Sequence, residues 1–344
     1  MFGRLLKKPS KSEKKARKLA EAFEVALAAE KTAVEAGLAA FEAGKAQVSR
    51  SSALLRRNVH RIEKGLCMPG PRRPVFAEQY LADTVMLYAK LAAAGDAEPD
   101  ELKWAHDVLS RYFDAVDQSV AFVAEAKAVW DAANAPQQGA ASDGAAFAPY
   151  RFADLPDYVG SELAALPDLD SYARLCRARR SQRWFSDTPV DPAVLERAVA
   201  CAAQAPSACN RQPFRFYAAR SREKVKAITD LPLGTAGFGA DLPVVVAVVG
   251  DLSMYAHARD RHLIFVDSGL ACMAFMQALT AAGLGSVPIN WPDIPENHAA
   301  LRDILGLAAY QVPVMLIGVG HPKPESMIPY SAKRPVHEVL HVVD

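Results

Sequence analysis

Cysteine is scarce in this sequence, and long apolar runs are missing. Five cysteines, an odd number, occur among 344 residues, and no two of them stand in a C-x-x-C spacing. Neither a disulfide framework nor a metal site is therefore expected. The longest strongly apolar run, residues 242–249, has the length of a strand, whereas a helix that spans a bilayer needs ~20 residues. The N-terminus also lacks the apolar stretch of a secretory signal, so we expect a cytoplasmic protein without a transmembrane segment.

The chain also lacks an excess of charge of either sign. Forty Lys and Arg balance 39 Asp and Glu, which gives a net charge of +1. A protein that binds nucleic acid as a whole usually carries a clear positive excess, and we expect no nucleic-acid partner. The one strongly basic stretch, residues 4–18, is interpreted as a solvated tail, with contact to an anionic membrane or polymer as the alternative.

The first half of the sequence has the pattern of helices. Residues 10–51 are rich in Ala, Glu and Lys and predict one long helix, or two helices broken near Gly37. Further helical patterns cover residues 76–94 and 99–133. We therefore predict a helical N-terminal region over residues 1–134.

Residues 135–170 change character and contain several prolines and glycines with little periodicity, which predicts a linker. The remainder, residues 171–344, alternates between helical and strand patterns. Helices are expected at 169–180, 192–204, from 222 onward and at 267–282, and strands at 215–219, 243–250 and 312–320. This order predicts an α+β domain over residues 171–344.

Two stretches at the start of this domain carry the chemistry. Arg179, Arg180, Ser181 and Arg183 lie within five positions, and several guanidinium forks together suit a phosphate group. The alternative is that these arginines are solvated charges at the end of a helix.

The second stretch, residues 205–214, sets small and amide-bearing residues between two prolines. It predicts a rigid loop whose backbone and polar side chains recognise a flat heterocycle, or else a merely structural turn.

Together these stretches resemble the nitroreductase family. The likeness continues in residues 267–271, 282–286 and 312–322, and in Lys333-Arg334-Pro335, so that it covers about half of the chain. It implies an α+β fold with a mixed sheet flanked by helices, here in a long form that begins with a helical extension. It also implies homodimers that hold one FMN at each of two sites in the subunit interface.

The residue assignments follow from the resemblance. Arg179, Arg180, Ser181 and Arg183 match the family's segment for the FMN phosphate and ribityl chain, and Lys333 and Arg334 match the basic pair that closes on that phosphate. Pro206, Ser207, Asn210 and Gln212 match the loop that reaches the flavin, in part from the other subunit. Pro288, Ile289 and Asn290 lie where the family offers backbone N–H groups to the flavin ring, although the family often has glycines there.

The implied activity is the reduction of an organic acceptor, such as a nitro compound, quinone or enone, by NADH or NADPH. Hydride would pass through flavin N5 in a ping-pong reaction, and no protein side chain need act as a catalytic residue. Two alternatives stay open. One is an oxygen-dependent flavin enzyme of the same fold, such as the dimethylbenzimidazole synthase branch. The other is a scaffold that has lost turnover.

Two features depart from simple family members. The stretch 220–242 is short where many relatives insert lid helices, so that a lid must come from elsewhere or be absent. The N-terminal region contains a polar stretch, residues 56–66, whose side chains either cover the substrate or form local ion pairs such as His60 with Glu63. This stretch looks like one in long nitroreductase-like proteins linked to surface-polysaccharide genes, which makes a sugar-linked substrate a hypothesis. His257 and His262, with neighbouring arginines, are further candidates for substrate contact.

Overall fold

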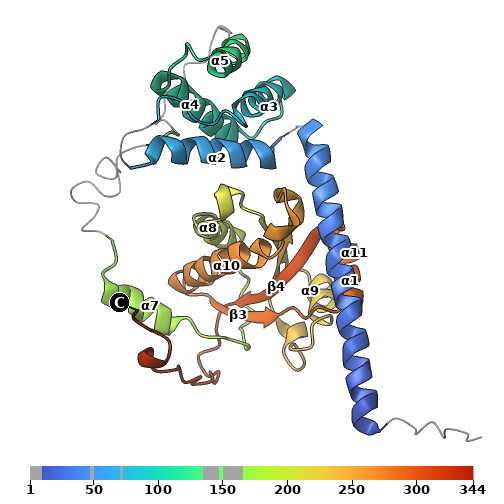
Figure 1. Cartoon of the computed structure of the whole chain (residues 1–344). Helices are drawn as coiled ribbons and strands as arrows, with labels where there is room; N and C mark the ends of the chain where they lie inside the picture. Colours follow the sequence, from blue (N-terminus) through green and yellow to red (C-terminus); the bar gives the residue numbers. More distant parts are fainter. Residues whose placement is uncertain (1–9, 47–49, 70–72, 135–146, 150–165, 344) are drawn as a thin grey trace, which may run out of the picture.

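The computed structural model describes residues 10–46, 50–69, 73–134, 147–149 and 166–343. Most of the predicted linker lies outside these residues. In Figure 1, a group of short helices lies above a sheet domain, and a long helix runs along the side of that domain.

In the N-terminal region, the described residues form five helices. They are α1 (Lys11–Ala46), α2 (Ala53–Cys67), α3 (Leu81–Ala94), α4 (Pro99–Ala115) and α5 (Ala121–Ala133). The single helix predicted over 99–133 is wrong, because the chain turns at residues 116–120, where Asp117 accepts hydrogen bonds from the backbone N–H and the hydroxyl of Ser119. Helices α2 to α5 share a core of their own, which includes Leu55, Tyr112 and Trp130.

Helix α1 runs unbroken through Gly37, so the predicted alternative of two helices is wrong. A Cβ atom at Gly37 would lie 2.7 Å from the Cβ of Leu252, in the 3₁₀ turn η5 (Leu252–Met254). The glycine therefore allows α1 to pack closely on the sheet domain rather than breaking the helix. Val34, on the same helix, is buried in the cluster with Leu252 and Tyr255.

In the second half, the described residues form four strands and five α-helices. They are α7 (Leu169–Ala178), α8 (Pro192–Ala203), β1 (Phe214–Ala219), α9 (Arg222–Thr229), β2 (Val244–Asp251), α10 (Leu263–Ala281), β3 (Gly285–Asn290), α11 (Pro295–Leu305) and β4 (Gln311–Gly320). The sheet order is β1-β2-β4-β3, and each pair of neighbours is antiparallel. The predicted α+β class is confirmed. Parallel pairing, which would make the sheet mixed, is limited in the described residues to one bridge between Ser181 and Ser286.

The sheet is covered on both faces, and the side chains of β2 explain how. Val244, Val246 and Val248 pack with α8 and α10, whereas Val245 and Ala247 pack with α9 and α11. Alternate side chains of a strand point to opposite faces, so a strand buried on both faces is apolar throughout. This is why residues 242–249 form the longest apolar run in the sequence.

Helix α10 is the central helix of this domain. It begins at Leu263, four residues before the predicted start. Residues 258–281 are long and apolar enough to cross a bilayer by length and composition, and 44% of the apolar 18-residue window within them is buried inside the protein. Its packing on α8 and on the sheet is that of a core helix.

Candidate functional site

The segment that follows α7 is fixed along the edge of the sheet. Ser181 bridges to Ser286 on β3, and the N–H of Gln182 donates to the carbonyl of Ser286 at 3.0 Å. Further along, the N–H of Ser186 donates to the carbonyl of His321 at 2.8 Å. Gly285 permits the approach, because a Cβ there would lie 2.9 Å from the side chain of Gln182. Arg179, Arg180 and Arg183 therefore lie on a segment whose register along β3 is fixed.

The C-terminal segment returns to these arginines. The guanidinium of Arg180 donates hydrogen bonds to the carbonyls of Pro329 and Tyr330. Lys333 and Arg334 follow directly along the chain, and Arg334 is paired with Glu338, with 3.0 Å between Nε and Oε2. Sequence positions more than 140 apart are thus brought to one edge of the sheet.

Pro288, Ile289 and Asn290 lie on the edge strand β3 and differ in what they present. The side chain of Ile289 is buried in the cluster on the α11 side of the sheet, whereas Pro288 and Asn290 are exposed. Since the carbonyl of Ser286 faces the open edge, strand alternation turns the backbone of residues 288 and 290 to the same edge. Proline has no N–H, so Asn290 offers the backbone donor there.

Loop 206–213 has an unusual backbone. Cys209, Asn210 and Gln212 all have positive φ angles, of 53°, 51° and 48°, a region that residues other than glycine seldom adopt. The N–H of Gln212 donates to Ser207 Oγ at 3.0 Å, and the Gln212 amide donates to Asn210 Oδ1 at 2.9 Å. The predicted residues Ser207, Asn210 and Gln212 therefore form one compact, internally bonded turn.

A buried carboxylate supports this turn. Asp267 of α10 is 3% exposed, and its Oδ2 accepts from the N–H of Ala208 at 3.0 Å and from the hydroxyl of Tyr255 at 3.1 Å. Burial raises the pKa of Asp267, and the two hydrogen bonds and Arg211 act in the opposite direction. Asp267 has no role among the sequence-based predictions. The signal was available, because Asp267 is the only charged residue in the sequence of α10.

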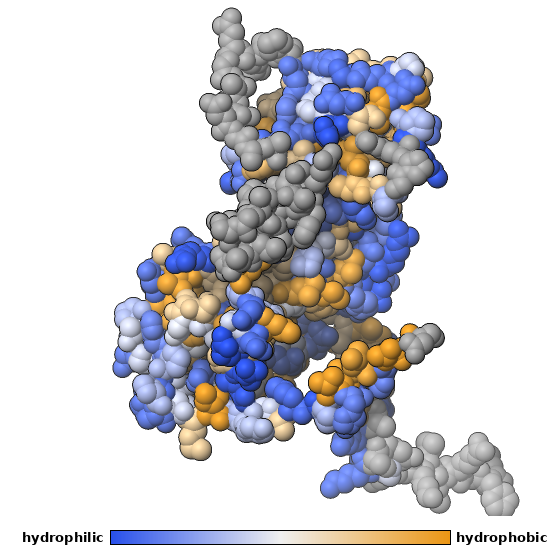
Figure 2. Space-filling view, turned by 90° about the vertical axis from the view of Figure 1, so that its left-hand side faces the viewer, coloured by the Kyte–Doolittle hydropathy of each residue, from blue (hydrophilic) through white to orange (hydrophobic). Residues whose placement is uncertain are grey.

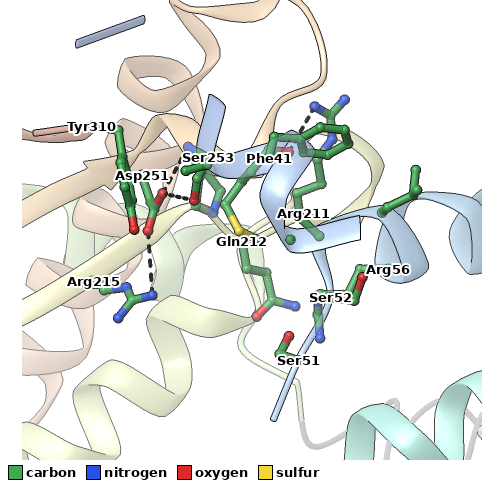
Figure 3. A pocket seen from close by; sticks show the side chains of 16 residues that line it. Phe41, Ser51, Ser52, Arg56, Arg211, Gln212, Arg215, Asp251, Ser253 and Tyr310 are labelled. Carbon is green, nitrogen blue, oxygen red and sulfur yellow. Dashed lines mark hydrogen bonds and ion pairs between the residues drawn. The ribbon is translucent and has the colours of Figure 1, made fainter. Parts of the chain in front are cut away.

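The structure keeps the two groups of predicted residues apart within one chain. Segment 179–183 lies beside the start of β3, at one edge of the sheet. Loop 206–213 precedes β1, at the other edge. A cavity of about 410 Å³ adjoins the loop, and Gln212, Arg56 and Ser52 are among the residues that line it (Figure 3). None of the arginines of segment 179–183 lines it.

The stretch expected to lack a lid folds away from this cavity. Within residues 220–242, α9 and the turn η4 (Gly239–Asp241) pack against each other, and Val225, Phe238 and Leu242 join the cluster on the α11 face of the sheet. Helix α2 instead lies on loop 206–213. The guanidinium of Arg56 donates to the carbonyl of Asn210 at 3.3 and 3.4 Å.

The other sequence candidates are paired within the fold or exposed. Arg261 pairs with Glu30 of α1 at 3.1 Å, His262 lies 4.0 Å from the same carboxylate, and His257 is exposed. His60 lies 3.6 Å from Glu63, as the ion-pair interpretation expected. The contacts with Glu30 attach α1 to the sheet domain, whereas the contact of His60 lies within α2. Among the described residues, none of these contacts involves Asp267.

Comparison with known proteins relates the second half of the chain to one protein family. The sequence profile of the nitroreductase family matches residues 176–236 and 230–321. Residues 176–321 form a nitroreductase family domain. The helical N-terminal region lies outside the match, in agreement with the expected long form.

Named relatives match about half of the chain. A putative NADH dehydrogenase/NAD(P)H nitroreductase of Archaeoglobus fulgidus is 28% identical over 160 residues, which is 46% of this chain and 88% of the relative. An FMN reductase [NAD(P)H] of Bacillus subtilis is 28% identical over 170 residues, 45% of this chain and 66% of the relative. A putative nitroreductase of Desulfovibrio desulfuricans, solved in complex with FMN, is 23% identical, with a TM-score of 0.43 over 50% of this chain and 96% of that one.

The residues on the edge of the nitroreductase domain suit the phosphate end of a flavin mononucleotide. Among the described residues, the guanidinium groups of Arg179 and Arg183 form no ion pair or hydrogen bond, and Arg183 lies over the ring of Phe238 at 5.7 Å. Ser286 is 1% exposed and its Oγ has no partner, although buried hydroxyl groups are normally hydrogen-bonded. Free guanidinium donors suit a phosphate group, and the unsatisfied hydroxyl of Ser286 belongs to the strand to which the arginine segment is bridged.

Proposed function

We propose that this chain is an FMN-dependent oxidoreductase that uses NADH or NADPH to reduce an organic acceptor, such as a nitro compound, a quinone or an enone. The observation that carries the proposal is segment 179–183, whose arginines and serine lie beside β3 and beside the C-terminal segment bound by Arg180. Membership in the nitroreductase family and the likeness to relatives named NAD(P)H nitroreductase and FMN reductase support the same activity.

We assign the phosphate of FMN to the guanidinium groups of Arg179 and Arg183 and the hydroxyl of Ser181. Arg180 has a different part, because its hydrogen bonds hold the C-terminal segment in place. That segment would bring Lys333 and Arg334 toward the same phosphate. Forked guanidinium donors give such a site both charge and direction.

When bound, FMN supplies the hydride chemistry between NAD(P)H and the acceptor, so the protein need provide no acid, base or nucleophile. The chain's own residues bind and orient. Asn290 offers a backbone N–H at the open edge of β3, and Asp267 holds loop 206–213 through the N–H of Ala208. Helix α2, which lies on that loop through Arg56, would exclude water in place of the lid helices.

We further propose a homodimer in which each FMN is held between segment 179–183 of one subunit and loop 206–213 of the other. The two groups lie at opposite edges of the sheet in one chain, so a second copy is needed to unite them. Helix α10 has an exposed apolar face of Phe265, Val266, Leu270 and Met273, which a partner subunit would cover. Figure 2 shows hydrophobic side chains at the surface of the lower part of the molecule.

The test is the absorbance spectrum of the purified protein, recorded without oxygen before and after addition of NADPH. We expect flavin absorbance bands that bleach on reduction and return when a quinone is added. Arg179→Gln combined with Arg183→Gln should lower FMN occupancy about tenfold or more, because each lost charge-assisted hydrogen bond weakens binding by about a factor of ten. A colourless protein that takes up no added FMN would contradict the proposal and favour the scaffold alternative.

A further inference from the structure

Two arginines on α2 lack a counter-ion where the neighbouring arginine has one. Arg56 is paired with Glu101 at 2.8 Å, and both side chains are largely buried. Arg57 and Arg61 lie one helical turn apart. In the part of the chain that the structure describes, neither guanidinium forms an ion pair or donates a hydrogen bond. The guanidinium of Arg61 lies over the ring of Tyr80 at 3.6 Å, and this stacking leaves its N–H edge available.

The surroundings of these arginines are positively charged. Arg211 of loop 206–213 is 5% exposed, contacts Asp260 at 3.6 Å, and has a buried Nε without a partner. Burial, followed by the charges of Arg61 and Arg211, lowers the pKa of Arg57, and Asp260 counteracts this only in part. Arg57 and Arg61 both act on the phenol of Tyr80 as well. Arg57, Arg61, Tyr80 and Arg211 thus form one cluster, called here the arginine recess.

Half-buried cations that repel one another are stabilised by an anion. The arginine recess offers two guanidinium forks and a phenol hydroxyl, which are donors that match a carboxylate or a phosphate. It lies where α2 meets loop 206–213, the loop expected to reach the flavin. The cavity beside Gln212 opens at the same junction and is lined by Arg56 and Arg211 (Figure 3).

We propose that Arg57 and Arg61 bind the carboxylate or phosphate group of a molecule that exchanges electrons with the flavin. This inference rests on the proposed function. It gives the helical region a role in substrate choice, because the recess belongs to α2 and Tyr80 rather than to the nitroreductase domain. The anionic group belongs either to the acceptor or to NAD(P)H, and matched pairs of probes separate these two sources.

The first pair of probes consists of 4-nitrobenzoate and 4-nitrobenzamide, which have nearly the same shape and differ in charge. Their dissociation constants are measured by calorimetry on the full-length protein, so that binding is read independently of turnover. If the acceptor carries the anion, Arg57→Gln and Arg61→Gln each weaken the binding of 4-nitrobenzoate about tenfold and change the binding of 4-nitrobenzamide less than about twofold. Arg61→Lys, which keeps the charge and loses the fork, should restore part of the affinity.

The second pair is NADPH and 1-benzyl-1,4-dihydronicotinamide, a hydride donor without phosphate. If the donor carries the anion, the same variants slow flavin reduction by NADPH about tenfold and leave reduction by the benzyl compound unchanged. Lys90→Gln, which removes an exposed charge from α3, is the control for a general loss of positive field. This variant should change neither the dissociation constants of the first pair nor the rates of flavin reduction by the second pair.

Variants that treat charged and neutral probes alike, in both pairs, would overturn the proposal. A loss of FMN from Arg57→Gln with unchanged probe ratios would also overturn it, since the recess would then serve the cofactor. Failure of the proposed function gives a different result. In that case the wild-type protein takes up no FMN, and this outcome does not depend on the affinities that calorimetry gives for the nitrobenzoate pair. Circular dichroism and the melting temperature of each variant establish that it is folded.

Discussion

Cys209, Asn210 and Gln212 hold loop 206–213 in a conformation that the backbone does not favour on its own. A positive φ angle at a residue other than glycine costs on the order of 1 kcal/mol or more, and this loop has three such residues within four positions. The hydrogen bonds to Ser207 Oγ and to the carboxylate of Asp267 offset that cost. Strain held in this way is frequent where a loop is pre-shaped for a ligand.

Asp267 should make stability depend on pH in a direction that can be stated. Burial raises its pKa above the ordinary 3.8, so the folded protein binds its proton more tightly than the unfolded chain. As pH rises from near 3.8 through the folded pKa, the unfolded state releases this proton first, and the free energy of unfolding falls. The loss persists above the folded pKa, because the ionised carboxylate then remains buried in the folded protein.

Asp267→Asn retains an acceptor for Ala208 and Tyr255 and removes the titration. We therefore expect the free energy of unfolding of the variant, minus that of the wild type, to increase with pH. Urea denaturation of both proteins between about pH 4 and about pH 7 measures this difference, and the other carboxylates cancel in the subtraction. A difference that stays constant or decreases would show that Asp267 does not titrate as the structure implies.

At the scale of elements, the sequence predicted helices and strands best where one periodicity runs for many residues. The apolar strand β2 and the long helix α1 were both found. Strand β3 and helix α11 were missed. Strand β3 is six residues long and contains Pro288, which weakens any strand pattern. Helix α11 begins with Pro295, and the residue that caps its C-terminal end, Gly306, has the left-handed conformation. This proline and glycine mark the two boundaries of the helix, and sequence reasoning could have used them.

The candidate site was predictable to a similar extent. Segment 179–183 and loop 206–213 are each contiguous in sequence, so motifs could indicate them as candidates, and their part in binding FMN stays a prediction. The supports of the loop come from distant positions, namely Tyr255 and Asp267 on one side and Arg56 on the other. Such supports depend on tertiary packing, and no spacing in the sequence brings them together.

Gly37 and Gly44 of α1 give a matched test of how this helix is attached. A Cβ at Gly37 would meet Leu252 at 2.7 Å, with the backbone carbon of that residue at 3.0 Å, whereas a Cβ at Gly44 would meet nothing within 4 Å. Alanine is favoured over glycine inside a helix by about 1 kcal/mol. Gly44→Ala should therefore raise the free energy of unfolding by about 0.5–1 kcal/mol, and Gly37→Ala should lower it by about 1–3 kcal/mol through overpacking. Thermal melts followed by circular dichroism compare the two, and equal stabilisation would mean that α1 is not seated on η5.

At the scale of the whole molecule, the proposed flavin site has an assembly requirement. Segment 179–183 and loop 206–213 lie at opposite edges of one sheet, so their union depends on a second subunit. The helical region touches the loop group through α2. In a dimer, the helical region of one subunit would therefore serve the cofactor held by segment 179–183 of the other, and loss of the dimer would remove flavin and substrate binding together.

Leu270→Glu tests that coupling. Leu270 lies within the exposed apolar face of α10, whose four members are 38–56% exposed. An unpaired carboxylate buried in the interface would cost several kcal/mol, so we expect a monomer that retains less than about a tenth of its FMN. Light scattering and flavin absorbance on the same sample measure both effects. Val129→Glu, at a 39% exposed apolar position on α5, should leave both unchanged. A monomeric Leu270→Glu protein that keeps its flavin would place the whole cofactor site within one chain.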